Sequence, residues 1–282
     1  LEHIHHYGGN SPDGKWIAWS SNRRHMTYFD IYIQNIETLE IRQVFVDDGS
    51  YFPVKWAPDG ETLLIRKSNT NLDNDLGLLQ LNTGEVNWLT THVGEASFDN
   101  PQFSGDGKQL YFLTNKDREF TGLASMDLST KEITWLDDSN WDLEELTMSS
   151  DKKRLAYTIN EGGISKGVIY HLEQNTKQSW ETPIGVISEL TFSPDHSKLA
   201  YVFNGPTNPS DIWEVDLESN QTRRKTYVSE SPVVQAQLIE PKLIKFNSFD
   251  GLEVPAFLYK PKNAKGKLPV VVFVHGGPES QI

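Results

Sequence analysis

An internal repeat constrains this chain more than any other feature of its sequence. Five segments align without gaps around an aspartate in a predicted turn, and these aspartates lie 46, 47, 45 and 44 residues apart. An aliphatic residue follows each aspartate at the fourth position and a large apolar residue at the sixth, the period-two alternation of a strand with one buried face. The five aspartates are Asp13, Asp59, Asp106, Asp151 and Asp195.

Each copy continues with further predicted strands. A second apolar strand follows a polar loop, as at 30–33 and 211–215, and a tight turn such as 82–84 leads to a strand such as 85–89. In the Pro-Asp-Gly turn, Pro presets φ, Asp binds the backbone and Gly supplies a positive φ. Four short antiparallel strands every 45 or so residues are typical of a propeller blade. A β-sandwich is the alternative, but sandwiches do not repeat at a fixed period.

We therefore predict an all-β fold over residues 1–230, a β-propeller of four-stranded blades with five repeats visible. The glycine of the turn is replaced by Lys152 in the fourth copy and by His196 in the fifth. The formal net charge of −13 argues against nucleic acid and anionic membranes as partners. The chain has no cysteine, which excludes disulfides and thiolate metal sites, and nothing in it predicts a cofactor.

The last fifty residues follow a different pattern. Residues 241–261 predict a β-hairpin with Asp250 and Gly251 at its turn. Residues 268–274 then form an apolar run without alternation, which is typical of a strand covered on both faces in a parallel or mixed sheet. That run is too short to cross a bilayer, and it leads directly into His275-Gly276-Gly277-Pro278.

The repeats resemble the blades of TolB-like and prolyl oligopeptidase-type propellers. The tail is similar to the opening of the α/β-hydrolase domain in the prolyl oligopeptidase family of serine peptidases, especially its acylaminoacyl-peptidase and dipeptidyl-peptidase-like branch. The resemblance implies that residues 231–282 are a linker and the first strands of a truncated hydrolase domain. It also implies that the backbone N–H of Gly276 or Gly277 contributes to an oxyanion hole.

Several further expectations depend on this resemblance. The chain would be the portion of a peptidase that admits short peptides to the active site, and peptides would be the substrate of the parent enzyme. The catalytic triad would lie beyond Ile282, so this chain alone would be inactive, and further blades would precede Leu1. The first residues carry no basic segment followed by an apolar run, and we expect a cytoplasmic protein. Self-association into a homo-oligomer stays open.

Two other functions remain in competition. The chain could be a non-enzymatic TolB-like propeller that binds other proteins, or a relative whose hydrolase domain lacks the triad. A Gly-x-Ser-x-Gly sequence between a strand and a helix further along the reading frame would favour the peptidase.

One Gly-x-Ser-x-Gly match does occur in this chain, at 163–167 around Ser165. A nucleophile elbow requires a buried strand before the serine and a helix after it. Here the match lies between two predicted strands of the fourth repeat, 155–159 and 168–172, and we interpret it as a blade loop.

Other polar groups give weaker signals. The acidic stretch 141–145 and the pair Asp73 and Asp75 have ligand types that suit Ca²⁺ or a cationic substrate terminus, but their spacing favours solvated loops. His3, His5 and His6 lie close together in the sequence without an acidic partner, and no metal site is predicted there.

Overall fold

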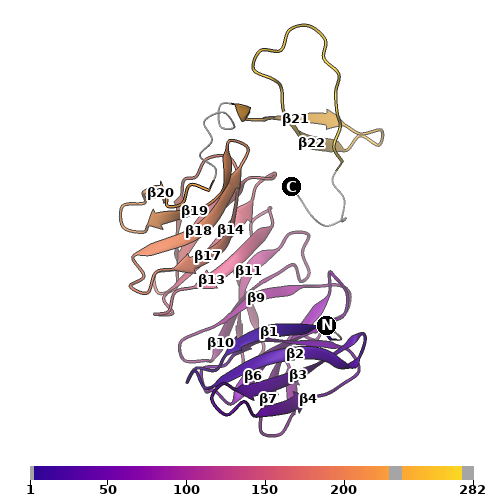
Figure 1. Cartoon of the computed structure of the whole chain (residues 1–282), viewed down its shortest axis with the longest axis vertical. Coiled ribbons are helices and arrows are strands. Elements are labelled where there is room, and N and C mark those ends of the chain that lie inside the picture. The colour runs from indigo at the N-terminus through magenta and orange to yellow at the C-terminus, as the bar shows by residue number, and fades with distance from the viewer. Residues whose placement is uncertain (1–2, 229–236, 275–282) are drawn as a thin grey trace. The chain divides into compact units, whose positions relative to one another are not determined.

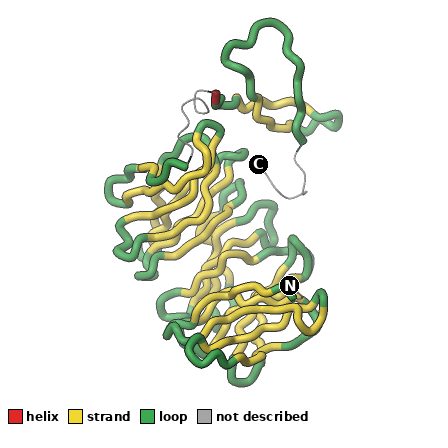
Figure 2. Tube along the Cα trace, viewed as in Figure 1, coloured by secondary structure: helices red, strands yellow, loops and turns green. Residues whose placement is uncertain are grey.

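Residues 3–228 and 237–274, which this computed structural model describes, consist almost entirely of β-strands and their connecting loops (Figures 1 and 2). This confirms the predicted all-β class. No helix in these two ranges is long and apolar enough to cross a membrane.

Each of the five repeats supplies four strands. The first repeat contains β1 (His5–Asn10), β2 (Trp16–His25), β3 (Tyr28–Asn35) and β4 (Ile41–Phe45). The second contains β5 (Ser50–Trp56), β6 (Thr62–Ser68), β7 (Asn74–Gln80) and β8 (Val86–Trp88). The third contains β9 (Phe98–Phe103), β10 (Gln109–Thr114), β11 (Gly122–Asp127) and β12 (Ile133–Asp137). The fourth contains β13 (Leu143–Met148), β14 (Arg154–Asn160), β15 (Ser165–His171) and β16 (Thr176–Trp180). The fifth contains β17 (Val186–Phe192), β18 (Lys198–Gly205), β19 (Asn208–Asp216) and β20 (Thr222–Arg224).

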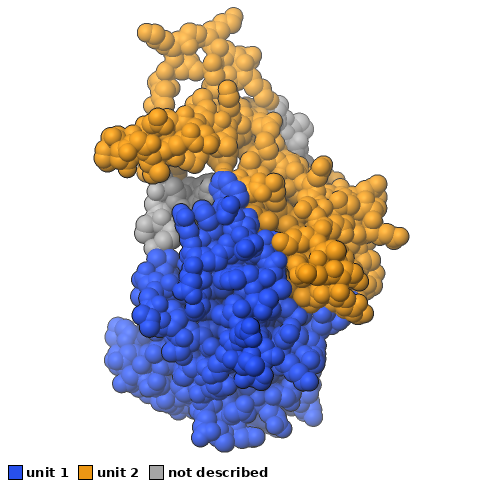
Figure 3. Space-filling view, turned by 180° about the vertical axis from the view of Figure 1, so that it is seen from behind, with its two compact units in different colours: residues 1–152 blue, residues 153–282 orange. Residues whose placement is uncertain are grey.

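The chain divides into two compact units, Leu1–Lys152 and Lys153–Ile282 (Figure 3). In the first unit, strands β1 to β4 and β5 to β8 pair antiparallel within their repeats, and one parallel pair, Phe29 and Ser50, joins the two sets. Strands β9 to β12 form a separate sheet there. In the second unit, β14, β15 and β16 pair antiparallel, as do β17 to β20.

The aspartate turns adopt the conformation that the sequence predicts. Ser11 Oγ donates a hydrogen bond to Asp13 Oδ1 at 2.6 Å, and the N–H of Lys15 donates to the same oxygen at 3.1 Å. These two bonds stabilise the carboxylate and lower the pKa of Asp13. In the second repeat Ala57 takes the place of the serine, and the hydroxyl of Thr62 donates to Asp59 Oδ2 at 2.8 Å instead.

The turn keeps its backbone shape where glycine is missing. Gly14, Gly60 and Gly107 have φ values of 71°, 70° and 69°. Lys152 and His196 occupy the same position with φ values of 61° and 60°. Since a side chain disfavours this left-handed region, the hydrogen bonds of the turn hold these two residues in it.

The cores consist of apolar residues from consecutive repeats. One core joins the first two repeats, a second joins the second and third, and another joins strands of the fourth and fifth. The predicted sixth-position residues are all buried: Trp19, Ile65, Phe112, Tyr157 and Tyr201. The expected alternation of a single buried face is present in β18, where Leu199, Tyr201 and Phe203 are buried and the residues between them are only partly buried. It is absent from β6, where Leu63, Leu64 and Ile65 are all fully buried because the third repeat packs against the second face.

The segment after the fifth repeat forms the predicted hairpin. Strands β21 (Lys242–Asn247) and β22 (Glu253–Leu258) pair antiparallel, and Gly251 at their turn has a φ of 87°. The strand predicted at 268–274 is not formed. No described strand pairs with this segment, so its backbone has no ladder to join.

Candidate functional site

Ser165 is the first residue of β15 rather than part of a loop, which corrects the sequence interpretation of its position. Its side chain is 2% exposed, and Ser165 Oγ accepts a hydrogen bond from the backbone N–H of Ile187 at 3.1 Å. Asn74, the first residue of β7 in the second repeat, has the same role. Its Oδ1 accepts a hydrogen bond at 3.1 Å from the N–H of Phe98, the first residue of β9 in the third repeat. Ser165 therefore connects β15 to the first strand of the next repeat and has no features of a nucleophile elbow.

The second glycine of that Gly-x-Ser-x-Gly match has a packing role. Gly167 lies opposite Trp180 in the β15–β16 register, and a Cβ atom at Gly167 would come within 2.0 Å of the indole ring. In the second repeat Gly77 lies opposite Trp88, where a Cβ atom would come within 2.8 Å of the ring. Gly167 therefore completes the Gly-x-Ser-x-Gly match because the blade requires a residue without a side chain opposite Trp180. The spacing of 90 residues between Gly77 and Gly167, two repeat lengths, is a sequence signal for this role.

The oxyanion-hole candidates Gly276 and Gly277 lie outside the described residues. The segment that leads to them is described, and its apolar side chains are exposed. Val270, Val271, Val272, Phe273 and Val274 are 78%, 92%, 79%, 81% and 82% exposed.

The two aspartates that the sequence suggested as solvated lie beside a buried histidine side chain. His92 is 5% exposed, and its Nε2 lies 3.1 Å from Asp73 Oδ1. Its Nδ1 lies 3.3 Å from Asp75 Oδ1 and 2.8 Å from the carbonyl oxygen of Thr90. Sequence reasoning missed His92 because it is distant from both aspartates along the chain. Within 3–228 and 237–274, no three or more His, Cys, Asp or Glu side chains are arranged to hold a metal ion.

The other weak candidates also have local roles. Asp142 Oδ1 accepts a hydrogen bond from the N–H of Thr121 at 2.9 Å. His5 packs edge-on against Trp19, with ring centroids 5.3 Å apart, and His6 packs against Phe52 at 5.2 Å. These histidine rings belong to aromatic clusters rather than to a common ligand set.

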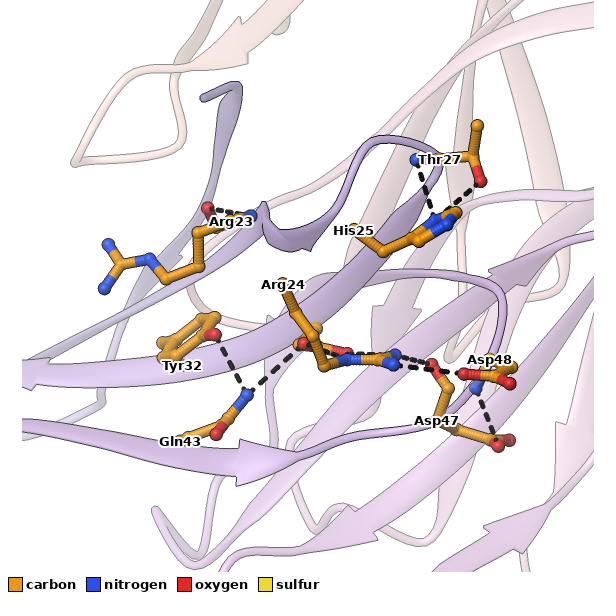
Figure 4. Close-up of polar contacts among 10 residues, drawn as sticks. Arg23, Arg24, His25, Thr27, Tyr32, Gln43, Asp47 and Asp48 are labelled. Carbon is orange, nitrogen blue, oxygen red and sulfur yellow. Dashed lines mark hydrogen bonds and ion pairs between the residues drawn. The ribbon is translucent and has the colours of Figure 1, made fainter. Parts of the chain in front are cut away.

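A dense ion-pair network lies at the end of β2 and the start of β3 (Figure 4). Arg24 Nε donates to Asp30 Oδ2 at 2.8 Å, and its Nη1 donates to Asp48 Oδ1 at 3.0 Å. Gln43 Nε2 donates to the hydroxyl of Tyr32 at 2.9 Å and to Asp30 Oδ2 at 3.3 Å. The two carboxylates raise the pKa of Arg24. Because its donors are used by partners in the same unit, this network stabilises the first repeat and is not a free binding site.

Lys55 on β5 is a cation with few partners. Its ammonium donates a hydrogen bond to the side-chain oxygen of Gln102 on β9. Burial, and next the positive charge of Lys152, lower the pKa of Lys55 to about 8. Gln102 connects Lys55 to the third repeat, so this contact links two blades.

A hollow of about 630 Å³ lies among the first strands of the first three repeats. Its walls come from β1, β5 and β9 and from the adjacent parts of β6 and β7. Phe52 contributes a partly exposed aromatic side chain to the lining, and Arg66 and Asp99 supply charges of opposite sign. Sequence reasoning did not find it, because its residues come from three repeats.

Comparison with known proteins adds to this geometry. A curated relative, the uncharacterized peptidase YuxL of Bacillus subtilis (strain 168), is 21% identical over an alignment 378 residues long, which covers 95% of this chain and 56% of YuxL. The chain therefore spans little more than half the length of this relative.

Two solved structures show the same fold. The structure of a prolyl endopeptidase superimposes on this chain with a TM-score of 0.66 at 15% identity. The superposition covers 94% of this chain and 48% of the endopeptidase chain. The structure of a protein assigned as TolB from Agrobacterium tumefaciens superimposes with a TM-score of 0.60 at 15% identity. The superposition covers 79% of this chain and 81% of the TolB chain.

The family model for the N-terminal β-propeller domain of prolyl oligopeptidase matches residues 42–227, well over half of the chain. The matched range contains the repeats from the last strand of the first to the end of the fifth. This chain belongs to the prolyl oligopeptidase N-terminal β-propeller family.

Proposed function

We propose that this chain is the propeller portion of a serine peptidase that hydrolyses peptide bonds of short peptides. In this proposal residues 1–230 form the propeller segment, and residues 231–282 are the linker and first strands of an α/β-hydrolase domain. The propeller covers the active site, admitting short peptides and excluding large folded proteins. The catalytic serine, acid and histidine lie beyond Ile282, and the 282-residue chain alone is inactive.

The uncovered apolar segment after the hairpin carries this proposal. Five consecutive apolar residues at 270–274 are each at least 78% exposed. Full burial of such a side chain is worth roughly 1.5–3 kcal/mol, so the exposed segment favours a partner that covers it. Strands and helices of a hydrolase domain would provide that cover on both faces.

In the same proposal Gly276 or Gly277 donates a backbone N–H to the oxyanion of the tetrahedral intermediate. Proline at either position removes the donor. We expect Gly276→Pro or Gly277→Pro in the whole protein to lower kcat about 100-fold or more for the position that supplies it. Unchanged kcat in both variants would contradict this role.

The decisive experiment compares the whole protein from the parent gene with the 282-residue chain. We expect a fluorophosphonate probe, which reacts with activated serines, to label the whole protein and not the chain. We also expect the whole protein to cleave N-acetylalanyl p-nitroanilide or a short peptide quickly. A folded protein that contains the same peptide sequence should be cleaved much more slowly. Substitution of the labelled serine by alanine is the control and should abolish turnover.

Two outcomes would contradict the proposal. Labelling or turnover by the 282-residue chain would place the active site within it. A whole protein that neither reacts with the probe nor cleaves peptides would favour the second candidate, a TolB-like propeller that binds other proteins. The similarity of the TolB structure, which covers 79% of this chain, supports this second candidate.

A cytoplasmic location and self-association remain proposals from the sequence.

A further inference from the structure

Arg66 is a half-buried cation whose hydrogen-bonding capacity is poorly used. Its side chain is 39% exposed, and its Nε is buried without a hydrogen-bond partner among the described residues. The nearest carboxylate oxygen is Asp99 Oδ1, 3.7 Å from Arg66 Nη1, which is beyond hydrogen-bonding distance. A guanidinium has five N–H donors, and a buried donor without an acceptor is unfavourable.

Two other arginines of this chain, Arg24 and Arg224, are more fully engaged. Arg24 donates to both oxygens of Asp30, to Asp48 and to the carbonyl oxygen of Asp47. Arg224 donates to Asp211 and to the carbonyl oxygen of Thr226. Arg66 therefore differs from arginines that serve only to connect strands.

The position of Arg66 within its sheet directs it into the hollow. Phe52, Arg66 and Leu76 lie directly opposite one another on β5, β6 and β7, and thus share one face of the sheet. The guanidinium carbon lies 5.6 Å from the centroid of the Phe52 ring. This cation–π contact holds the planar group beside an apolar wall without using its N–H donors.

These features select one ligand chemistry. A planar guanidinium with free N–H groups matches a carboxylate, which it binds through two parallel hydrogen bonds. The partly exposed ring of Phe52, which lies beside the guanidinium, suits an apolar group attached next to that carboxylate. Asp99 disfavours a doubly charged anion such as phosphate, because its carboxylate repels the second negative charge.

We propose that Arg66 binds the C-terminal carboxylate of a peptide whose last side chain is apolar, with that side chain in the hollow. The peptide as ligand rests on the proposed function. The site would hold the carboxyl end of a substrate or product inside the propeller, and free carboxyl ends would be preferred to amidated ones.

The test is a titration of the 282-residue chain with N-acetylalanylphenylalanine and with the same dipeptide carrying a C-terminal amide. We expect the acid to bind about ten-fold or more tightly than the amide, because only the acid makes charge-assisted hydrogen bonds. Arg66→Gln should remove this preference. Arg66→Lys should retain part of it, because lysine keeps the charge and loses the paired donors. Arg42→Gln is the matched control, since Arg42 is half exposed and pairs with Glu40, and it should leave the preference unchanged.

Asp99→Asn provides a second measurement that does not depend on the folding of an Arg66 variant. Loss of the competing carboxylate should strengthen binding of the acid and leave binding of the amide unchanged. Equal binding of acid and amide by the unmodified chain, or an acid preference that survives Arg66→Gln, would overturn the proposal. Tighter binding of inorganic phosphate than of the dipeptide acid would also overturn it.

These outcomes are separate from those of the proposed function, because the titration does not require hydrolysis. A whole protein without peptidase activity would contradict the proposed function even if the acid preference is observed. Conversely, a peptidase whose propeller binds acid and amide equally would contradict only the role of Arg66.

Discussion

Ser165 Oγ accepts the backbone N–H of Ile187 at 3.1 Å, and so connects the third strand of the fourth repeat to the first strand of the fifth. Both residues are almost completely buried. A buried N–H needs an acceptor, and at this point the acceptor comes from the preceding repeat.

The first prediction concerns this bond. Ser165→Ala should leave peptidase turnover of the whole protein unchanged, because Ser165 Oγ is engaged by the N–H of Ile187 at the start of a strand and does not lie in a nucleophile elbow. It should lower the free energy of unfolding of the 282-residue chain by about 1–2 kcal/mol, because the Ile187 N–H loses its acceptor. Chemical denaturation and a peptide assay measure the two effects. Ser210→Ala, at an exposed serine, is the control. A loss of turnover of two orders of magnitude would make Ser165 the nucleophile.

The second prediction concerns the glycine beneath Trp180. Gly167→Ala should destabilise the chain by about 1–3 kcal/mol, because the new methyl group overlaps the indole ring and the ring must move. The double variant Gly167→Ala with Trp180→Leu should recover part of this loss, since a smaller side chain leaves room. Denaturation midpoints of the two variants provide the measurement. Equal stability of Gly167→Ala and the unmodified chain would contradict the packing role.

The third prediction concerns the turn of the fifth repeat. His196 has a φ of 60°, a region where a side chain costs about 1–2 kcal/mol relative to glycine. Glycine also increases the freedom of the unfolded chain, which offsets part of the gain. We expect His196→Gly to raise the free energy of unfolding by about 0.5–1 kcal/mol. The reciprocal change Gly60→Ala, at a φ of 70°, should lower it. Thermal denaturation tests both, and a destabilised His196→Gly would show that the imidazole makes a contact worth more than the strain.

The fourth prediction is a pH dependence that arises from Lys55. Its pKa is about 8 in the folded chain and near 10.5 in the unfolded chain, so between these values the unfolded chain binds more protons. Stability due to this group therefore increases as the pH rises from 8 to 10.5, and below pH 8 the burial of the charge opposes folding in full. From pH 7 to pH 9.5 the gain should be about 1–2 kcal/mol relative to a Lys55→Met variant. Urea denaturation at the two pH values measures it. A parallel pH dependence in both proteins would show that Lys55 stays charged when folded.

Much of the fold follows from the sequence because its signals are local. Asp13 and its equivalents determine a turn within five residues, and Asp250 with Gly251 determines the hairpin in the same way. Leu64 illustrates the limit of such signals, because its burial depends on a neighbouring repeat that the period-two pattern does not describe.

The candidate sites depend on longer distances along the chain. His92 lies 19 and 17 residues after Asp73 and Asp75, and Asp99 lies 33 residues after Arg66. No spacing rule connects these residues, since His92 reaches the aspartates through the loops of one repeat and Arg66 reaches Asp99 through the packing of two repeats. The apolar run at 268–274 forms no strand among the described residues, because no neighbouring strand of a parallel sheet is present for it to pair with.

The exposed run at 270–274 also affects how the chain behaves at high concentration. It contains four valines and a phenylalanine, residues of high β-propensity, and no charge. A net charge of −13 repels one molecule from another in dilute buffer of low ionic strength, and added salt screens this repulsion. Solubility is therefore a balance between an acidic surface and five residues near one end, and we expect it to fall as salt is added.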